Sequence, residues 1–254
     1  MVTTAEPCEL DAILSLRDMY RLEMSCQVIH DSIHARPGWT QEYSLRIDGN
    51  QVGYGSVAIG GPWTQTPALY EFFVADPYRL KVFELFNALQ KACGAAKMET
   101  QSNDILTTVM FHTYAKNVVS ESVLFRDDVT THCAPGGASF RTATEADGLD
   151  ISSRQLPWHG VVEVDGAVAA TGGILFHYNR PYGDIYMDVR EGFRRRGLGA
   201  FIVQELKRVC SEGGFIPGAR CRPTNVPSQR TLQRAGFVPY ANILVGDLPP
   251  LESD

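Results

Sequence analysis

Two glycines and three arginines stand together in the last third of the chain. Gly197 and Gly199 directly follow Arg194 to Arg196, and an apolar helical pattern begins at Leu198. A strand before this loop and a helix after it would direct several backbone N–H groups and the positive end of the helix dipole to one point. Because glycine has no Cβ, an anion can approach the backbone closely, and the arginines add positive charge. The segment therefore predicts a phosphate-binding loop.

Two common phosphate-binding patterns do not fit this loop. A dinucleotide-binding G-x-G-x-x-G segment needs a third glycine where Ile202 stands, and a Walker loop needs Gly-Lys followed by Ser or Thr. What remains is R-x-x-G-x-G, formed by Arg194, Gly197 and Gly199 after a predicted strand that ends at Val189. The loop therefore indicates another class of phosphate site.

The strand before the loop carries the first candidates for acid–base chemistry. Asp184, Tyr186 and Asp188 alternate along it, so a period of two places them on one face. We take Asp184 as the first candidate for a general base and Asp188 as the second, acting directly or through water. Capping of the preceding turn is the alternative role of Asp184. His177, late in the preceding strand, is a further candidate base, with a hairpin hydrogen bond as its alternative role.

The elements that position these residues occur twice in the same order. After a helix predicted over residues 10–33, the first half has predicted strands over 44–47, 51–59 and 69–74 and a helix over 80–92. The second half has predicted strands over 161–164, 167–178 and 184–189 and a helix over 198–210. This order indicates an internal repeat of one α/β unit.

The residues of the two halves also match. The sequence I-D-G-N-Q-V-G-Y-G-S from Ile47 aligns with V-D-G-A-V-A-A-T-G-G from Val164, and the segment 74–79 aligns with 189–194. Each half then has a strand followed by an asparagine, Asn103 or Asn225, that we predict as the N-cap of a last helix. We therefore divide the chain into units 1–138 and 139–254, with 133–137 as the linker.

The first unit lacks the features of the anion loop. The alignment places Val82 at the position of Gly197 and Glu84 at the position of Gly199. A branched side chain and a carboxylate there would block and repel a phosphate. We therefore predict that the first unit is a degenerate copy that supports the second or forms a wall of its acceptor site.

Composition excludes several classes of function. The chain has 254 residues, 44% of them hydrophobic and 20% charged, as expected of a folded protein. Its net charge of −6 argues against a nucleic-acid partner. The first thirty residues contain no long apolar run, so we expect no signal peptide, no membrane span and a cytoplasmic location. The cysteines and histidines lack the spacing of metal ligands, so we expect free thiols and no metal.

The second half resembles the GNAT superfamily of N-acyltransferases. The resemblance rests on R-x-x-G-x-G and on a downstream N-x-x-S-x-x-x-L-x-x-A-G-F, formed by Asn225, Ser228, Leu232, Ala235, Gly236 and Phe237. It covers about residues 139–245. With its repeat, the whole chain resembles the tandem-GNAT proteins. This implies an α/β (α+β) fold of two units, each a mixed, mostly antiparallel sheet flanked by helices.

The resemblance implies acetyl-CoA as the co-substrate, with its pyrophosphate on the glycine loop and with backbone amides around Val189 near pantetheine and the acyl carbonyl. An acetyl thioester is already activated, so the protein has to orient an amine, remove its proton and polarise the carbonyl. No covalent nucleophile is required. The implied cofactor-binding residues are Met187, Val189, Arg194, Arg195, Arg196, Gly197, Leu198, Gly199, Ala200, Asn225 and Ser228.

The general acid is where the sequence departs from the family. Family members frequently have a tyrosine four residues before the glycine of Gly-Phe, and here that residue is Leu232. We take Tyr240 as the catalytic replacement and Tyr186 as a second candidate, with packing as the alternative role of each. Trp158 and Trp63 likewise have two interpretations, contact with an acceptor or anchoring of the core.

These residues favour an N-acetyltransferase that transfers an acetyl group from acetyl-CoA to a primary amine of a small molecule or peptide by direct attack. The alternative is an acyl-CoA-binding sensor or pseudoenzyme without turnover, because the tyrosine is missing and the base has competing candidates. No membrane partner is expected. The chain is expected to be a monomer or a homodimer, since tandem units can bury in one chain the contact that single units make in pairs.

Overall fold

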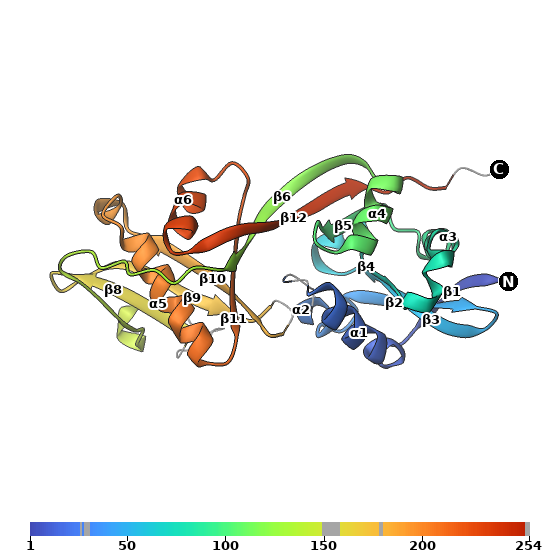
Figure 1. Ribbon diagram of the computed structural model, residues 1–254, viewed down its shortest axis with the longest axis horizontal. Coiled ribbons are helices and arrows are strands. Elements are labelled where there is room, and N and C mark those ends of the chain that lie inside the picture. Colours follow the sequence, from blue (N-terminus) through green and yellow to red (C-terminus); the bar gives the residue numbers. More distant parts are fainter. Residues whose placement is uncertain (26, 28–30, 149–157, 178–179, 252–254) are drawn as a thin grey trace. The chain divides into compact units, whose positions relative to one another are not determined.

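The computed structural model describes residues 1–25, 27, 31–148, 158–177 and 180–251 (Figure 1). The chain forms two compact units, one of residues 1–121 with the segment from Asn242 onward, and the other of residues 122–241. Each unit is a mixed, mostly antiparallel sheet with helices, which confirms the predicted fold class. Within the described residues, no helix combines the length and the apolar character needed to cross a membrane.

The first unit has its strands in the order β1-β2-β3-β4-β5-β12. Neighbours are antiparallel except β4 and β5. The strands are β1 (Thr3–Cys8), β2 (Thr40–Ile47), β3 (Asn50–Ala58), β4 (Ala68–Val74), β5 (Lys97–Gln101) and the end of β12 (Phe237–Asp247). The helices are η1 (Leu10–Ile13), α1 (Leu14–Met24), α2 (Asp31–His34), η2 (Gly61–Trp63), η3 (Asp76–Lys81), α3 (Val82–Cys93) and α4 (Ile105–Tyr114).

The second unit has its strands in the order β6-β11-β10-β9-β8-β7. Here β10 and β11 are the parallel neighbours. The strands are the end of β6 (Lys116–Asp127), β7 (Ala138–Thr142), β8 (His159–Val164), β9 (Ala167–Leu175), β10 (Tyr182–Val189) and β11 (Ile216–Cys221). The helices are η4 (Glu145–Asp147), η6 (Glu191–Phe193), α5 (Leu198–Glu212) and α6 (Val226–Arg234).

The two units repeat each other in backbone detail. The hairpin turns at Asp48 and Asp165 both adopt positive φ, 46° and 51°, and each is followed by a glycine with positive φ. After the third strand of each repeat, the same hydrogen bond returns to the second strand: Ala75 N–H donates to Val52 at 2.9 Å, and Arg190 N–H to Ala169 at 3.0 Å. The aligned sequences therefore build the same hairpin and the same exit from the sheet.

Two predicted details were wrong. The first helical segment is not continuous over residues 10–33, because η1 leads into α1, which ends at Met24 where Ser25 adopts a left-handed conformation. Residues 26 and 28–30 of that prediction lie outside the described residues. The N-cap of α4 is Asp104, not Asn103, since the Asp104 carboxylate accepts a hydrogen bond from Thr107 N–H at 2.9 Å. Asn225 caps α6 as predicted.

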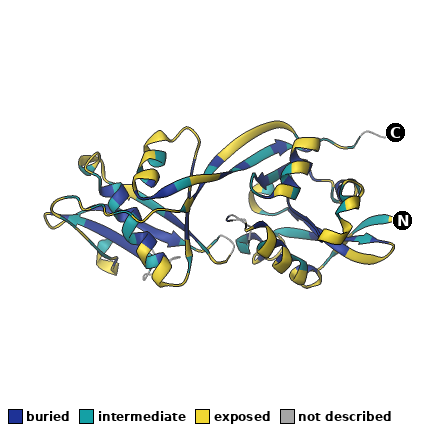
Figure 2. Ribbon diagram, in the orientation of Figure 1, coloured by how far each residue is buried: buried dark blue, intermediate teal, exposed yellow. Residues whose placement is uncertain are grey.

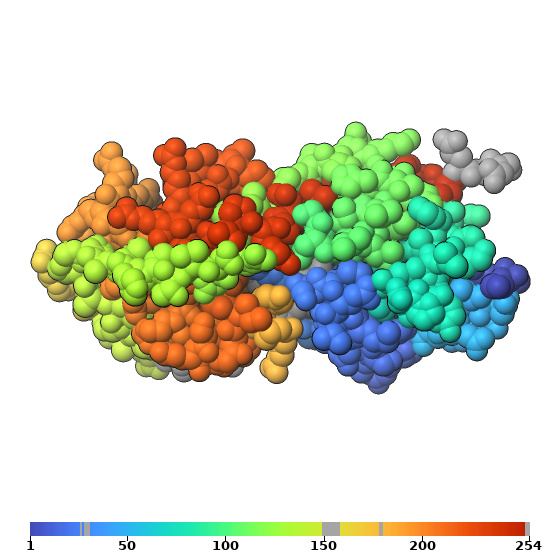
Figure 3. All heavy atoms as spheres, viewed as in Figure 1, coloured from blue at the N-terminus to red at the C-terminus, as the bar shows by residue number. Residues whose placement is uncertain are grey.

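The compact units divide the chain differently from a cut at residue 138. Residues 123–126 of β6 pair with β11 in the second unit, and residues 243–247 of β12 pair with β5 in the first. The segment after β6 runs along the surface of the second unit as a yellow-green strip in Figure 3. It is held to α5, where Gln204 contacts Cys133 N–H at 2.6 Å and Lys207 donates to Val129 C=O at 2.9 Å.

Each unit has its own apolar core between sheet and helices (Figure 2). In the second unit, α5 lies against β8, β9 and β10. Its apolar residues recur with helical spacing, and Ile202, Val203 and Leu206 are fully buried. Burying each such side chain contributes roughly 1.5–3 kcal/mol, so the helix that follows the glycine loop is firmly fixed on the sheet. That fixes the position of its first turn.

In the first unit, a group of charged side chains is buried under α1 and α2. Glu71 of β4 is fully buried and accepts two hydrogen bonds from Arg17, at 3.1 and 3.0 Å, and one from Tyr54 at 2.9 Å. His34 bridges Glu42 at 3.0 Å and Glu71 at 3.3 Å. Burial alone would raise the pKa of Glu71, but Arg17 and His34 hold it well below its usual value. These contacts fasten α1 and α2 to the sheet.

We expect this group to make the stability of the first unit depend on pH. Burial lowers the pKa of His34, but Glu71 and Glu42 outweigh it and raise it from 6.5 to about 9. The folded protein therefore binds a proton that the unfolded chain releases above pH 6.5, so this stabilisation is complete below pH 6.5 and is lost as pH rises through 9. The shift corresponds to about 3 kcal/mol.

Urea unfolding at a series of pH values between 6 and 10 measures this effect. His34→Gln should flatten the decline in the free energy of unfolding, whereas His112→Gln, at an exposed position of α4, should leave it unchanged. A wild-type protein equally stable at pH 6.5 and pH 9.5 would contradict the assignment.

Candidate functional site

The site begins where β10 and β11 separate. The two strands pair only from Tyr182 with Ile216 to Asp184 with Gly218. Beyond this point, in the described part of the chain, β10 continues to Val189 paired with β9, and β11 continues to Cys221 paired with β6. The backbone of β10 from residue 185 to 189 therefore has an edge, inside the sheet, that faces no ladder partner. A ligand can bind to that edge without entering from the rim of the sheet.

The glycine loop lies at the wide end of this separation. The chain leaves β10 through η6, and Arg194 Nε donates to the Val189 carbonyl at 3.0 Å. Arg195 and Gly197 then adopt positive φ, 63° and 81°, before α5 starts at Leu198. The first amides of a helix have no acceptor within it, so those at the start of α5 point out of its N-terminus toward the loop. This is the predicted geometry for binding an anion.

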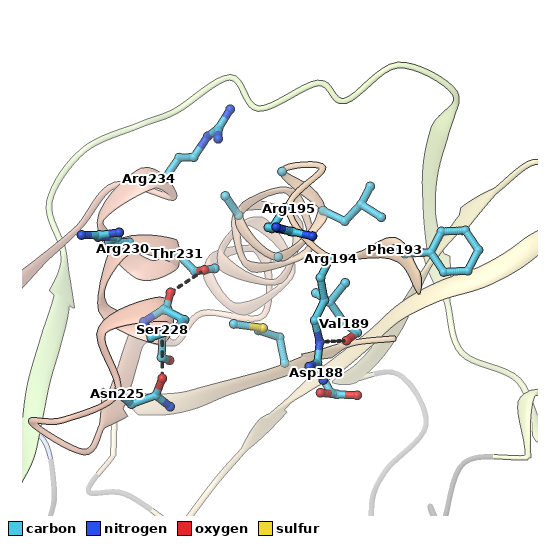
Figure 4. A pocket seen from close by; sticks show the side chains of 16 residues that line it. Asp188, Val189, Phe193, Arg194, Arg195, Asn225, Ser228, Arg230, Thr231 and Arg234 are labelled. Carbon is cyan, nitrogen blue, oxygen red and sulfur yellow. Dashed lines mark hydrogen bonds between the residues drawn. The ribbon is translucent and has the colours of Figure 1, made fainter. Parts of the chain in front are cut away.

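A pocket of about 690 Å³ occupies the space in front of the loop (Figure 4). Its walls come from the end of β10, the loop and first turn of α5, and one face of α6. Most of the predicted cofactor-binding residues line it: Met187, Val189, Arg194, Arg195, Gly197, Leu198, Gly199, Ala200, Asn225 and Ser228. Asp188, the second candidate base, also lines it.

The α6 wall supplies two arginines that the sequence analysis missed. Arg230 and Arg234 line the pocket together with Thr231 on the side opposite Arg194 and Arg195 (Figure 4). With Pro227, these residues follow the i, i+3, i+4, i+7 spacing of one helix face, so examining the faces of the helix after its cap would have found them. Phe193 and Pro227 were missed as well. The pocket therefore has cationic side chains on two sides and helix amides at its end.

The pocket is narrow at Gly199. A Cβ at this position would lie 3.0 Å from Thr231 Cγ2, closer than side chains usually approach, and 3.5 Å from Val189 Cγ2, which is an ordinary contact. A Cβ at Gly197 would make only ordinary contacts, the nearest with Arg234 at 3.8 Å, but its φ of +81° favours glycine. The two glycines therefore serve different ends: Gly197 allows the turn, and Gly199 leaves room between α5 and α6.

Two predicted residues lie apart from the pocket. The guanidinium of Arg196 is not among the lining groups and lies 5.6 Å from the centre of the Phe193 ring. The ring of Tyr240 is covered by the guanidinium of Arg126 at 4.9 Å. Trp158 packs against Phe176 and Phe215, with ring centres 4.9 and 5.6 Å away, which supports its interpretation as a core anchor.

Asp184 lies on the other face of the sheet from α5. Its neighbour Gly183 faces α5, because a Cβ there would lie 2.9 Å from Cys210 Sγ, so the alternating Asp184 faces away. The Asp184 carboxylate is almost buried, and its Oδ2 atom contacts His177 Nε2 at 2.9 Å and Arg220 Nε at 3.8 Å. Both of these contacts are with side chains. Asp184 therefore stands where the two strands separate, on the face of the sheet opposite α5.

The first unit keeps the frame of this site but not the loop. Arg79 Nε donates to the Val74 carbonyl at 3.0 Å, as Arg194 does to Val189. Where the second unit has the glycine turn, however, η3 runs directly into α3. Glu84 then occupies the first turn of α3 and pairs with Lys81 at 2.9 Å. The start of α3 is thus occupied by the chain's own carboxylate.

Comparison with known proteins identifies the class of the second unit. Residues 130–237 match the acetyltransferase (GNAT) family, so the C-terminal region of the chain contains a GNAT acetyltransferase domain. Enzymes of this family use acetyl-CoA as co-substrate and act on amine acceptors, which implies acyl transfer from acyl-CoA here. No curated protein matches the sequence.

Solved structures share the fold over nearly the whole chain. A GNAT-family acetyltransferase from Colwellia psychrerythraea has a TM-score of 0.73 at 13% identity, covering 97% of this chain and 100% of that one. The tandem GNAT protein from the clavulanic acid biosynthesis pathway has a TM-score of 0.62 at 14% identity, covering 99% of this chain and 100% of that one. At such identities the likeness establishes a tandem GNAT fold alone.

We expect Gly199→Glu to abolish binding of acetyl-CoA. The new Cβ would press on Thr231, and the carboxylate would copy Glu84 at the start of α3. Like charge at an anion site and loss of space together should weaken binding at least about a hundredfold. Isothermal titration calorimetry should find one site per chain in the wild type and none in the variant. Gly136→Glu, where a side chain has open space, is the matched control. Two wild-type sites would show that the first unit binds as well.

We expect Arg230→Gln and Arg234→Gln each to weaken acetyl-CoA binding about tenfold, because each removes a cation from the α6 wall. The loss should shrink as salt is added, since screening weakens the wild-type contact. Arg208→Gln, on the exposed side of α5 where Arg208 pairs with Glu212, should bind normally. If all three variants bound acetyl-CoA with equal affinity, the arginines of α6 would not contribute to the site.

Proposed function

We propose that the protein is an N-acetyltransferase that transfers an acetyl group from acetyl-CoA to a primary amine of a small molecule or peptide. The observation that carries the proposal is the position of the arginine- and glycine-lined pocket at the wide end of the separation between β10 and β11. A phosphate group and a reacting carbonyl can thus be held by one continuous site, with a carboxylate, Asp184, at its narrow end.

The residues present fit acetyl-CoA. Its pyrophosphate matches the loop amides and the arginines on the two walls, and Gly199 keeps open the gap that a Cβ would close. Backbone groups of β10 near Val189 would hold the pantetheine arm along the free edge, since that edge offers the alternating donors and acceptors of an unpaired strand. The cofactor supplies an acetyl group already activated as a thioester.

The protein's own task is then orientation and proton transfer. Backbone N–H groups at the β10 edge polarise the carbonyl that the amine attacks. We assign the general base to Asp184, with Asp188 as the competing candidate. His177 and Arg220 both contact Oδ2 of Asp184, and they leave Oδ1 as the oxygen that receives the proton of the amine. A thiol has a pKa near 8.5, so the leaving thiolate needs little help from an acid, and Tyr240 is not required for that step.

We assign cofactor binding to the second unit only, and a supporting role to the first. The support for this is the sequence of the loop: the first unit keeps the arginine contact to the strand but has Glu84 at the helix start. Its buried charged group fills the face of β4 under α1 and α2, where the second unit has Asp184.

Asp184→Asn should lower kcat by about 10²- to 10⁴-fold while the affinity for acetyl-CoA stays unchanged, because the amide keeps the size of the side chain but cannot take the proton. Release of the free thiol from acetyl-CoA in the presence of a panel of amines measures turnover, and calorimetry measures binding. A larger loss in Asp188→Asn than in Asp184→Asn would transfer the role of base to Asp188. A wild-type protein that binds acetyl-CoA and acetylates no amine would contradict the proposed function.

A further inference from the structure

The face of the second sheet that carries Asp184 also carries a row of aligned residues. Asp184 of β10 pairs with Gly218 of β11, and Gly218 pairs with Arg126 of β6. Residues opposite each other in neighbouring strands point to the same face, so Asp184 and Arg126 share one face with a glycine between them. Two strand spacings separate them, or about 10 Å between Cα atoms. The candidate base and a cation thus flank one position that has no side chain.

Arg126 is held in place but not neutralised by its closest contacts. Its guanidinium lies over the ring of Tyr240, 4.9 Å from the ring centre, in a cation–π contact that favours this position. Its ion pair is with Asp128 at 3.7 Å, longer than a good charge-assisted hydrogen bond, and its side chain is 50% exposed. A guanidinium fixed by an aromatic ring and open to solvent is well suited to bind a carboxylate or phosphate.

A second arginine closes the distance between this cation and the base. Arg220 follows Gly218 by two residues on β11 and so shares its face. Its Nε lies 3.8 Å from Asp184 Oδ2. Arg220 thus lies next to the candidate base, and Arg126 lies diagonally across from it on β6. The positive charge on this face therefore begins next to Asp184 and extends toward Arg126.

The arginines beside Asp184 indicate that the acceptor carries more than an amine. For an acceptor that is only an amine, the carboxylate base and an acidic surface around it would be sufficient, because both attract a cationic amine. The arginines have the opposite effect, since they repel a simple amine cation unless the same molecule carries a negative charge for them to bind. Of the other acidic groups, Asp188 lies on the same face of β10 but four residues further along the strand, and Glu163 of β8 is already paired with Arg141 at 2.8 Å.

We propose that the acceptor is an amine that carries an anionic group, a carboxylate or a phosphate, only a few bonds from its nitrogen, and that Arg126 stacked on Tyr240 binds that group. This rests on the proposed acetyltransferase function and narrows its substrate class. It also gives Tyr240 the role of supporting a binding residue in place of the general acid predicted from sequence.

Matched pairs of amines test the proposal. Each α-amino acid is compared with its amide, and phosphoethanolamine with ethanolamine, as acceptors at saturating acetyl-CoA. We expect at least one anionic member to have a kcat/KM ten or more times that of its neutral partner, and the family of pairs that shows it identifies the anion as carboxylate or phosphate. Arg126→Gln should remove this preference mainly through a higher KM, Arg126→Lys should restore part of it, and Arg208→Gln should leave it intact.

Three outcomes overturn the inference: neutral amines accepted as well as their anionic partners, a loss in Arg126→Gln that is equal for both members of a pair, or an unchanged preference in that variant. The first leaves the acetyltransferase function standing, so the two proposals fail separately. If no amine is acetylated, the function itself fails, and binding of the same acids and amides is measured by ligand-observed NMR. Binding of an acid that is lost in Arg126→Gln supports the anion site, and equal binding by both proteins contradicts it.

Discussion

The pairing of β10 with β11 ends after three residues, and the rest of the second unit depends on that early end. Parallel strands that stayed paired to Val189 would leave no free backbone edge inside the sheet. Because β11 turns to pair with β6 and β10 stays with β9, the opening is bordered by strands that are each stabilised on their far side. The edge can thus remain free for a ligand without weakening the sheet, and α5 is fixed across the same strands by its buried apolar face.

The two units share one frame and differ in the short segment that forms the candidate anion loop of the second. Both keep the hairpin turn with positive φ, the return of the chain to the second strand, and an arginine that donates to the last strand carbonyl. The difference lies in the few residues that follow. A glycine that permits positive φ gives a turn whose amides point outward, whereas without it the chain continues from η3 into α3 and a glutamate takes the first turn. Packing of the strands and helices determines the shared frame, and the few residues of the loop determine whether an anion can bind.

The sequence was sufficient where a feature is local. The turns, the glycine loop, the Asn225 cap and the repeated order of strands follow from residue types at short spacing, and the structure has them at nearly the predicted residues. It was insufficient where partners are distant along the chain. Nothing local in β6 indicates that residues 123–126 pair with β11, so the sequence could not show that Arg126 lies on the same face as Asp184. The contact of His177 with Asp184 depends likewise on the register of β9 against β10, and Asp104 displaced Asn103 as cap by one residue because either side chain suits that position.

The sheet of the second unit also solves an electrostatic problem that a single pocket would not. Residues alternate between its faces, so Met187 and Val189 face the phosphate loop while Asp184, one strand position away from Gly183, faces the other side. Asp188 already lines this pocket, and a second carboxylate among Arg194, Arg195, Arg230 and Arg234 would compete further with a phosphate for them. With the candidate base Asp184 on the opposite face, its contacts with His177 and Arg220 both involve a single oxygen, Oδ2. The alternation of one strand thereby keeps the candidate anion-binding residues and the candidate base apart, although they lie only a few residues from each other.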